Sequence, residues 1–495
     1  MNNHDFENIV SVIRNTQAAY PSQQNGFSPG VSYPEYPFGS DISDQKNDVY
    51  EMIRESFRML GMDDSRYGTP QWSPLSEIIQ PGETVLLKPN LVYHRNFAPE
   101  NGLDCLITQP LLVRAMVDYV YIALRGKGNI IVADAPMQSC EFDVLKQNSG
   151  YNQMLDFYDK HQVHIEFLDL RNVITKLEND VLINQPVVNS NENVTIDLGQ
   201  NSYHAGLSNE RYKNYRILDY DPTIMTKHHN ADKNEYLVAK KILDANVIIN
   251  MPKPKTHRKA GVTIALKNLV GINTNKEWLP HHTKGSKMSG KGDEYLISSR
   301  FRVLHAYVQD LYNYFHARNE NSFATKLSRK ILGYFNKKAP QHRYDFFSEG
   351  SWYGNDTIWR TILDLNLILR YVDSDGNLQK TRQRKVFNVA DMIISGEAEG
   401  PLLPKPKDVG IIAMAYNSVC MDEVIAALMG VDIEFIPTIR NARSNSDYPL
   451  CTVDRQPEIV SNDEQWNLNY AGIKGKPNLN FEMPSGWREY NNPQK

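Results

Sequence analysis

The chain has 495 residues, of which 41% are hydrophobic and 23% charged, and its formal net charge is −4. This composition is typical of a globular protein with two or three domains, or one large domain with insertions. The negative net charge argues against a general nucleic-acid binder, and no run approaches the roughly 18 apolar residues of a membrane helix.

The sequence favours a cytoplasmic location. The first residues, MNNHDFENIVSVIRN, lack the basic start and apolar core of a signal peptide. The four cysteines are far apart and form no CxxC pair, which argues against a zinc or iron–sulfur site built from neighbouring residues. No iron–sulfur cluster held by the chain is therefore expected. The cysteines are Cys105, Cys140, Cys420 and Cys451.

Residues 1–80 are predicted to form an arm followed by one helix. Residues 20–45 are rich in Pro, Gly, Ser and Tyr, which is typical of an extended segment that wraps around a folded body. Residues 48–60 place their apolar side chains at helical spacing.

Residues 81–275 alternate strand-like and helix-like patterns, and they are predicted to form the first part of an α/β core. Strands are expected at 85–88, 130–134 and 247–250, and a helix at 111–124 with Thr108 as its N-cap. Each strand stops at a polar cluster that contains a proline. Alternation of this kind indicates a parallel sheet covered by helices.

The remaining chain is predicted to hold an insertion, a second part of the core and a tail. Residues 276–350 form the insertion, in which 281–294 (HHTKGSKMSGKGDE) is expected to be a lid that is mobile when the site is empty. Residues 351–440 resume the core, with helices at 356–369 and 422–429 and strands at 386–394 and 409–414. Residues 441–495 are expected to form a surface tail. The predicted fold class is α/β, a mostly parallel central sheet covered by helices, with a lid-like insertion and extended N- and C-terminal arms.

The strongest candidate site follows the strand at 247–250. Lys253, Lys255, His257 and Lys267 lie within about fifteen residues, a clustering that indicates an anionic ligand. Ligands of open α/β sheets bind at the carboxyl ends of the strands. The candidate catalytic residues are His257, Lys255 and Lys267, and the anion-binding candidates are Lys88, Asn90, Lys253 and Asn268.

Neighbouring lysines disfavour the charged form of His257, so a neutral imidazole is expected there. It would serve as a general base or as a metal ligand, and a structural histidine is the alternative.

Two further sets of residues have a functional and a structural interpretation. Trp352, Asn355 and Asp356 would form a platform for a sugar or a nucleobase, or else Asn355 or Asp356 caps a helix. Asp134, Glu397 and Asp422 would hold a divalent ion or orient the lysines. The alternative for Asp134 is a turn or helix cap, and for Glu397 it is a solvated acid in the loop GEAEGP (396–401). The alternative for Asp422 is an acid favoured at a helix N-terminus.

His281 and His282, with Asp293 and Glu294, also suit a divalent metal, or else form a solvated loop.

These motifs together resemble a bacterial and archaeal family called domain of unknown function 362. The resemblance rests on KPN at 88–90, on KTH followed by TIALKNLVG (255–271), on GEAEGP and on Asp422. It covers roughly residues 80–275 and 385–430. Many relatives carry ferredoxin-like cysteine clusters, which this chain lacks. The blocks at 281–294 and 350–365 resemble a longer subgroup associated with genes for cell-surface polysaccharides.

The leading hypothesis is an enzyme acting on an anionic small molecule, a phosphorylated sugar or a nucleotide-linked intermediate, in cell-surface polysaccharide metabolism. The alternatives are a non-catalytic accessory protein that holds a partner or cofactor, and a redox protein of the iron–sulfur-associated family. The cofactor is unknown, with a divalent metal ion as the candidate. A homo-oligomer is compatible with the sequence.

Overall fold

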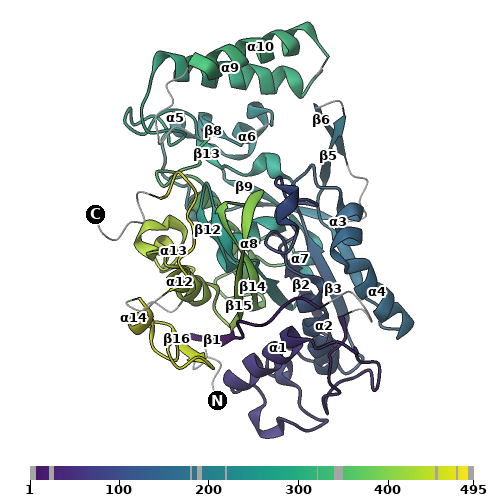
Figure 1. The fold of residues 1–495 in the computed structure, drawn as a ribbon. Coiled ribbons are helices and arrows are strands. Elements are labelled where there is room, and N and C mark those ends of the chain that lie inside the picture. Colours follow the sequence, from purple (N-terminus) through teal and green to yellow (C-terminus); the bar gives the residue numbers. More distant parts are fainter. Residues whose placement is uncertain are drawn as a thin grey trace.

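The computed structural model describes residues 7–21, 27–178, 181–186, 192–217, 220–319, 321–338, 349–451, 455–474 and 478–488. A ten-stranded sheet forms its centre (Figure 1). The strands of this sheet are β1 (Ile9–Arg14), β2 (Thr84–Pro89), β3 (Asn129–Asp134), β4 (Glu166–Asp169), β10 (Val247–Met251), β11 (Lys255–His257), β12 (Gly261–Thr263), β14 (Lys385–Glu399), β15 (Leu403–Ala415) and β16 (Glu458–Ser461).

The main path through the sheet is β16-β1-β15-β14-β10-β2-β3-β4, and β11 and β12 add to it beside β14. The neighbours from β14 to β4 are parallel, and so are β1 and β16, whereas β15 runs antiparallel to both β1 and β14. The predicted α/β class with a mostly parallel sheet is therefore confirmed.

Helices cover both faces of the sheet because its strands are apolar on both sides. In β2, Val85 and Leu87 face one buried cluster and Leu86 faces another, as the two-residue period of a strand requires. The first face is covered by α1 (Asp48–Met59), α2 (Pro110–Leu124), α3 (Phe142–Ser149) and α4 (Tyr151–Lys160). The second is covered by α7 (Lys240–Asp244), α8 (Ala265–Asn268), α11 (Ile358–Tyr371), α12 (Ser418–Met429) and α13 (Pro437–Asn441).

The register brings three predicted strand ends to one edge. Lys88 of β2 lies beside Asn250 of β10, and Leu87 lies beside Val132 of β3, two residues before Asp134. These strands and the segment after residue 385 share one sheet, whereas a second lobe facing the sheet was the alternative expected for that segment. Thr108 has a different role from the predicted helix cap, because its Oγ1 donates to the Met251 carbonyl and accepts from the Asn90 N–H.

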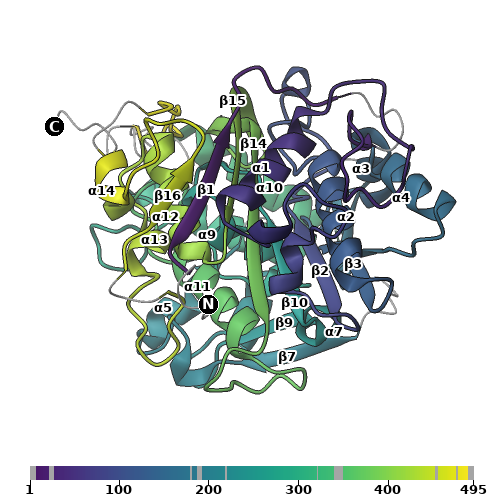
Figure 2. The same ribbon diagram turned by 90° about the horizontal axis from the view of Figure 1, so that it is seen from below.

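The N-terminal segment supplies a strand of the sheet as well as an arm and a helix. Strand β1 lies between β15 and β16, and Figure 2 shows it next to the β14–β15 pair. The predicted arm at 20–45, of which 22–26 lie outside the described residues, begins at Tyr20 in a buried polar contact. Tyr20 Oη donates to Asp391 Oδ1 (2.7 Å) and accepts from Lys253 Nζ (2.6 Å).

The C-terminal segment is more than the surface tail expected from its composition. Its strand β16 forms one edge of the sheet, and it also contains the short helix α14 (Tyr470–Ile473). Trp466, Phe481 and Trp487 are buried against α12 and β15 in the second core cluster. Widely spaced aromatic residues carry this burial, and such spacing gives no periodic signal in the sequence.

Smaller elements surround the core above the strand ends. They include three two-stranded sheets and two short helices. The sheets are β5 (Val173–Glu178) with β6 (Val181–Pro186), β7 (Asn193–Asp197) with β9 (Glu235–Ala239), and β8 (Tyr215–Arg216) with β13 (His282–Thr283), and the helices are α5 (Asn209–Lys213) and α6 (Pro222–His228). Helices α9 (Arg300–His316) and α10 (Phe323–Lys338) form a hairpin at the top of Figure 1. Among the described residues, no helix has both the length and the apolar character needed to cross a bilayer.

Replacing Tyr20 with Phe tests how the N-terminal arm is anchored. We expect the free energy of unfolding to fall by about 1–3 kcal/mol, because buried Lys253 and Asp391 each lose a hydrogen bond. Urea denaturation at pH 7 measures the change. Tyr334→Phe is the matched control, since Tyr334 is exposed, and it should change stability by less than about 0.5 kcal/mol. Equal losses in the two variants would contradict the anchoring role.

Candidate functional site

Two ion pairs neutralise two of the predicted anion-binding lysines. Lys88 Nζ lies 2.7 Å from Asp134 Oδ1 and also donates to the Pro89 carbonyl. Lys253 Nζ lies 3.1 Å from Asp391 Oδ2, and all four side chains are buried. Burial lowers the pKa of Lys88 and of Lys253, and the carboxylate partner opposes that shift. These two lysines therefore hold internal charges in place, which limits what they can offer a ligand.

A chain of asparagine amides connects the strand ends. Asn90 Nδ2 donates to Asn268 Oδ1, Asn268 Nδ2 donates to Asn250 Oδ1, and Asn250 Nδ2 donates to Asn388 Oδ1, at 2.8–2.9 Å. The four side chains come from β10, β14, α8 and the turn after β2, and all are buried. Amides satisfy one another without adding charge, so this polar layer is buried at little electrostatic cost.

Lys255 is fully buried and bonds only to neutral groups. Its Nζ donates to Asn90 Oδ1 (2.9 Å), to the Leu106 carbonyl (2.8 Å) and to the Lys253 carbonyl (3.3 Å). Burial lowers the pKa of Lys255 well below its usual value, and the nearby Lys253 ammonium adds to the shift. No carboxylate of the described residues pairs with it.

Lys267 lies where this network reaches the surface, and Lys276 is buried beside the same turn. Lys267, Val270 and Gly271 are half-buried, and Lys276 donates to the Val270 and Asn273 carbonyls. In the part of the chain that the structure describes, Lys267 makes no hydrogen bond or ion pair. Burial, reinforced by Lys88, lowers the pKa of Lys267 to about 8, and burial lowers that of Lys276 to about 7. Both amines are therefore present in charged and neutral forms near neutral pH.

His257 is neutral but is arranged as a hydrogen-bond donor. Burial first, and Lys267 second, lower its pKa well below the usual value. Its Nδ1 accepts from the Lys259 and Ala260 N–H groups, both at 3.1 Å. A neutral ring with an accepting Nδ1 carries its proton on Nε2. In this arrangement Nε2–H can donate to an anion and Nδ1 already accepts two hydrogen bonds, while the expected role of His257 as a general base stays a prediction.

The three carboxylates proposed as metal ligands have separate partners. Asp134 pairs with Lys88, Glu397 lies 3.0 Å from Lys407, and Asp422 accepts from the N–H groups that begin α8. The GEAEGP segment was predicted as a loop, but its first four residues lie inside β14, where Glu397 opposes Lys405 of β15. Within the described residues, no group of three His, Cys, Asp or Glu side chains is placed to hold a metal ion.

Gly271 covers the Lys88–Asp134 pair from above. Its carbonyl accepts from the Ala135 N–H, which brings the turn at Leu269–Ile272 against the end of β3. A methyl group at this position would overlap Asp134 Oδ1 and lie 2.6 Å from Lys88 Nζ. Only glycine allows the backbone to approach the ion pair this closely.

The aromatic segment after residue 351 packs against the predicted lid. Trp352 is buried, and its Nε1 donates to the Asp293 carbonyl. Asn355 Oδ1 accepts from the Thr357 and Ile358 N–H groups, so it fixes the turn that leads into α11. Asp356 is held by Arg211 and Arg360. Trp352 is buried by these contacts, which favours the structural interpretation, while a ligand-binding role of this segment stays a prediction.

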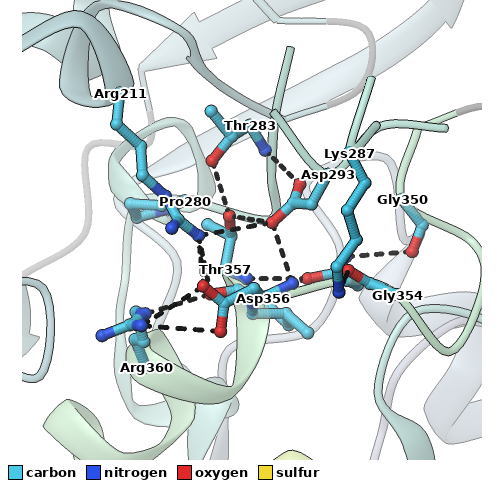
Figure 3. Close-up of polar contacts among 12 residues, drawn as sticks. Arg211, Pro280, Thr283, Lys287, Asp293, Gly350, Gly354, Asp356, Thr357 and Arg360 are labelled. Carbon is cyan, nitrogen blue, oxygen red and sulfur yellow. Dashed lines mark hydrogen bonds and ion pairs between the residues drawn. The ribbon is translucent and has the colours of Figure 1, made fainter. Parts of the chain in front are cut away.

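Asp293 fixes the segment 281–294 to this aromatic segment (Figure 3). Its Oδ1 accepts from the Thr283 N–H (2.6 Å), and its Oδ2 accepts from Thr357 Oγ1 (2.6 Å) and from the Asp356 N–H (2.9 Å). The segment expected to be a mobile lid is therefore fixed here by contacts to residues outside it. Its backbone is held by hydrogen bonds and by β13, while its opening on ligand release stays a prediction.

The two neighbouring histidines of this segment have different surroundings. His281 Nδ1 donates to the Leu279 carbonyl, and burial together with Lys259 lowers its pKa to about 3. His282 is buried in β13 and burial lowers its pKa well below the usual value. Each ring is therefore neutral near pH 7.

A family model with the description Domain of unknown function (DUF362) matches residues 85–199 and 170–427, more than half of the chain. The chain belongs to the DUF362 family. No curated protein and no solved structure matches it. In this DUF362 chain the matched ranges contain Lys88, Asp134, Lys255, Lys267 and Lys276, so the lysine cluster lies within the family domain.

Some members of this site were not singled out from the sequence of the DUF362 chain. Asn250 lies among the apolar residues of β10, and Asn388 and Asp391 lie among those of β14. Lys276 lies beyond the KTH–KN block, in a 3-10 turn that returns to the Val270 carbonyl. A polar residue within a buried strand is the signal that would have marked the two asparagines and Asp391.

Two buried cysteines lie close together although they are far apart in sequence. Cys420 Sγ, in α12, and Cys451 Sγ are 3.6 Å apart in the second core cluster.

Gly271→Ala tests the close approach to the ion pair. We expect a loss of about 1–3 kcal/mol in the free energy of unfolding, because the added methyl group must displace Asp134 or the turn. Gly333→Ala in α10 is the control, since its added Cβ meets nothing within 4 Å and alanine stabilises a helix interior by up to about 1 kcal/mol. Thermal unfolding followed by circular dichroism compares the two. An unchanged Gly271→Ala variant would contradict the close packing.

Asp293→Asn tests how the segment 281–294 is held. In the variant, an amide nitrogen replaces one carboxylate oxygen of Asp293 and cannot accept the hydrogen bonds that this oxygen accepts. Local opening of the segment 281–294 therefore becomes easier. We expect trypsin to cleave after Lys284, Lys287 or Lys291 several-fold faster than in the unchanged protein, as read by mass spectrometry. Asp232→Asn, at an exposed loop position, is the control. Equal cleavage in both variants would show that Asp293 does not hold the segment.

Proposed function

We propose that this DUF362 chain is an enzyme that acts on an anionic small molecule, with Lys267 as its proton-transfer group. The observation that carries the proposal is a group of three lysines, Lys255, Lys267 and Lys276, that lack a carboxylate partner among the described residues. Lys255 and Lys276 are buried and donate to neutral groups, whereas half-buried Lys267 makes no hydrogen bond within the described residues. They lie at the carboxyl ends of β2 and β10, where open α/β sheets bind ligands.

The lysines of this region include two that have structural roles and one that is available to bind a ligand. Lys88 and Lys253 are neutralised by Asp134 and Asp391, so they shape the site without attracting a ligand. Lys267 has no such partner among the described residues and is half-buried. An anion that enters beside it supplies the missing negative charge, and the low polarity of the surroundings strengthens the attraction.

Proton transfer suits Lys267 better than the other basic groups. With a pKa of about 8, the amine is present in both forms near neutral pH, which is the condition for efficient acid–base catalysis. The His281 ring has a pKa of about 3 and is a weak base. His257 Nε2–H and the Lys276 amine would orient the anion by hydrogen bonds.

The remaining sequence-based expectations are part of the same proposal. The substrate class is a phosphorylated sugar or a nucleotide-linked intermediate of cell-surface polysaccharide metabolism, handled in the cytoplasm, because a cationic cluster recognises phosphate groups. A divalent ion carried by the substrate would add charge without needing a protein metal site. Assembly into a homo-oligomer is compatible with this function.

Sulfate binding measured against pH tests the proposal, because the charge of sulfate is constant above about pH 3. Protonated Lys267 and Lys276 attract the anion, so affinity is highest below about pH 7 and falls as pH rises through 7–8. A bound anion raises both pKa values, so binding near pH 8 takes up protons. Isothermal titration calorimetry in HEPES and in Tris measures affinity and proton uptake together.

Three variants separate charge from proton transfer. Lys267→Met should weaken sulfate binding by about 10–100-fold, since a charge-assisted hydrogen bond contributes about 1.5–3 kcal/mol. Lys267→Arg should keep the affinity but lose the change near pH 8, because arginine stays charged. Lys127→Met, at an exposed position on the body, should change nothing. Affinity that is independent of Lys267 would overturn the proposal.

A further inference from the structure

The α9–α10 hairpin exposes a continuous apolar face. On α9 the exposed side chains recur at helical spacing, and so do those on α10. Phe323 is 81% exposed, and Tyr307 and Tyr334 are each more than half exposed. Large apolar side chains gathered in this way mark an interaction surface. The two stripes consist of Val303, Leu304, Tyr307 and Leu311 on α9, and Phe323, Leu327, Ile331 and Tyr334 on α10.

Both stripes lie on the same side of the hairpin. The ring contact of Phe301, at the start of α9, with Phe335, near the end of α10, shows that the helices are antiparallel. At 100° per residue, the centre of each stripe lies about 85–105° from this contact in the same rotational sense. Because the helices run in opposite directions, equal rotations bring the two stripes to one side.

The opposite side of α9 is attached to the body. Arg302, His305 and Asn313 of α9 are buried. Asp310 forms ion pairs with Arg216 (2.8 Å) and Lys284 (2.5 Å). The hairpin is therefore held with its apolar face directed away from the sheet, at the end of the molecule shown at the top of Figure 1.

The hairpin is also strongly basic. The sequence from 300 to 338 holds eight Lys and Arg against two Asp and Glu, a net charge of +6 in a chain whose net charge is −4. Arg300, Lys326 and Lys330 are exposed, and the two lysines directly precede Leu327 and Ile331 at the edge of the α10 stripe. Cations beside exposed aromatic and aliphatic side chains are characteristic of helices that lie in the interface of anionic membranes.

We propose that the α9–α10 hairpin binds the surface of a membrane that contains anionic lipids. The two stripes enter the headgroup region, and the exposed Arg300, Lys326 and Lys330 lie against lipid phosphates. Docking against a second copy is disfavoured, because each hairpin carries +6 and the two would repel. This inference goes beyond the proposed function, since it concerns where the protein works and leaves the reaction unchanged.

Vesicle sedimentation of the full chain tests the proposal. We expect binding to vesicles of 70% phosphatidylcholine and 30% phosphatidylglycerol, and at least tenfold weaker binding to pure phosphatidylcholine. The double variants Phe323→Ser/Leu327→Ser and Lys326→Glu/Lys330→Glu should each lower the partition coefficient by at least about tenfold. Val31→Ser, an exposed apolar position elsewhere, is the control and should bind like the unchanged protein.

Three results would overturn the membrane proposal. The first is equal binding to anionic and to pure phosphatidylcholine vesicles, and the second is an equal loss of vesicle binding in the control variant. The third is a dimer that forms without lipid and that Phe323→Ser/Leu327→Ser dissociates, which would assign the face to a second copy. Circular dichroism and sulfate titration of each variant show whether fold and site are intact. Sulfate binding at Lys267 is expected in all of them, so failure of the membrane proposal is distinguishable from failure of the proposed function.

Discussion

The ion pair between Lys88 and Asp134 is the interaction on which the candidate site depends. It joins the carboxyl ends of β2 and β3, and it also determines the shape of the turn at Gly271 that covers it. A buried ion pair costs desolvation energy, which is offset here because each partner makes a further hydrogen bond, Lys88 to the Pro89 carbonyl and Asp134 to the Leu91 N–H. With these charges satisfied, the neighbouring amines of Lys267 and Lys276 are the basic groups that lack a carboxylate partner among the described residues.

Strand ends were predictable from the sequence because they depend on local patterns. The apolar runs before Lys88, Asp134 and Pro252 identify buried parallel strands, and the known geometry of such sheets places their ends together. The family was also recognisable, since the KTH–KN block is long and continuous. These features involve neighbours in the chain, whose relation is visible in a single sequence.

Side-chain roles were less predictable because they are set by tertiary partners. His257 becomes a donor through the backbone N–H groups of Lys259 and Ala260, and Glu397 is paired by Lys407 on the adjacent strand. The low apolar content of 281–294 indicated a loose loop, yet Asp293 fixes that segment through three hydrogen bonds to distant residues. The composition of a segment shows how much apolar surface it can bury. A buried carboxylate such as that of Asp293 stabilises a segment in another way, through a few hydrogen bonds to distant residues.

The position of β1 has a consequence for the order in which the sheet assembles. Residues 9–14 pair with β15 and β16, which lie about 400 and 450 residues later in the sequence. The strands from β2 to β10 are closer together in sequence and can pair first, whereas β1 can join the sheet only when β15 is in place. Contacts of such sequence separation slow folding, and an apolar strand that is still unpaired invites association with other chains. The pairing of β1 is therefore the step of sheet assembly at which association with other chains competes most directly with folding.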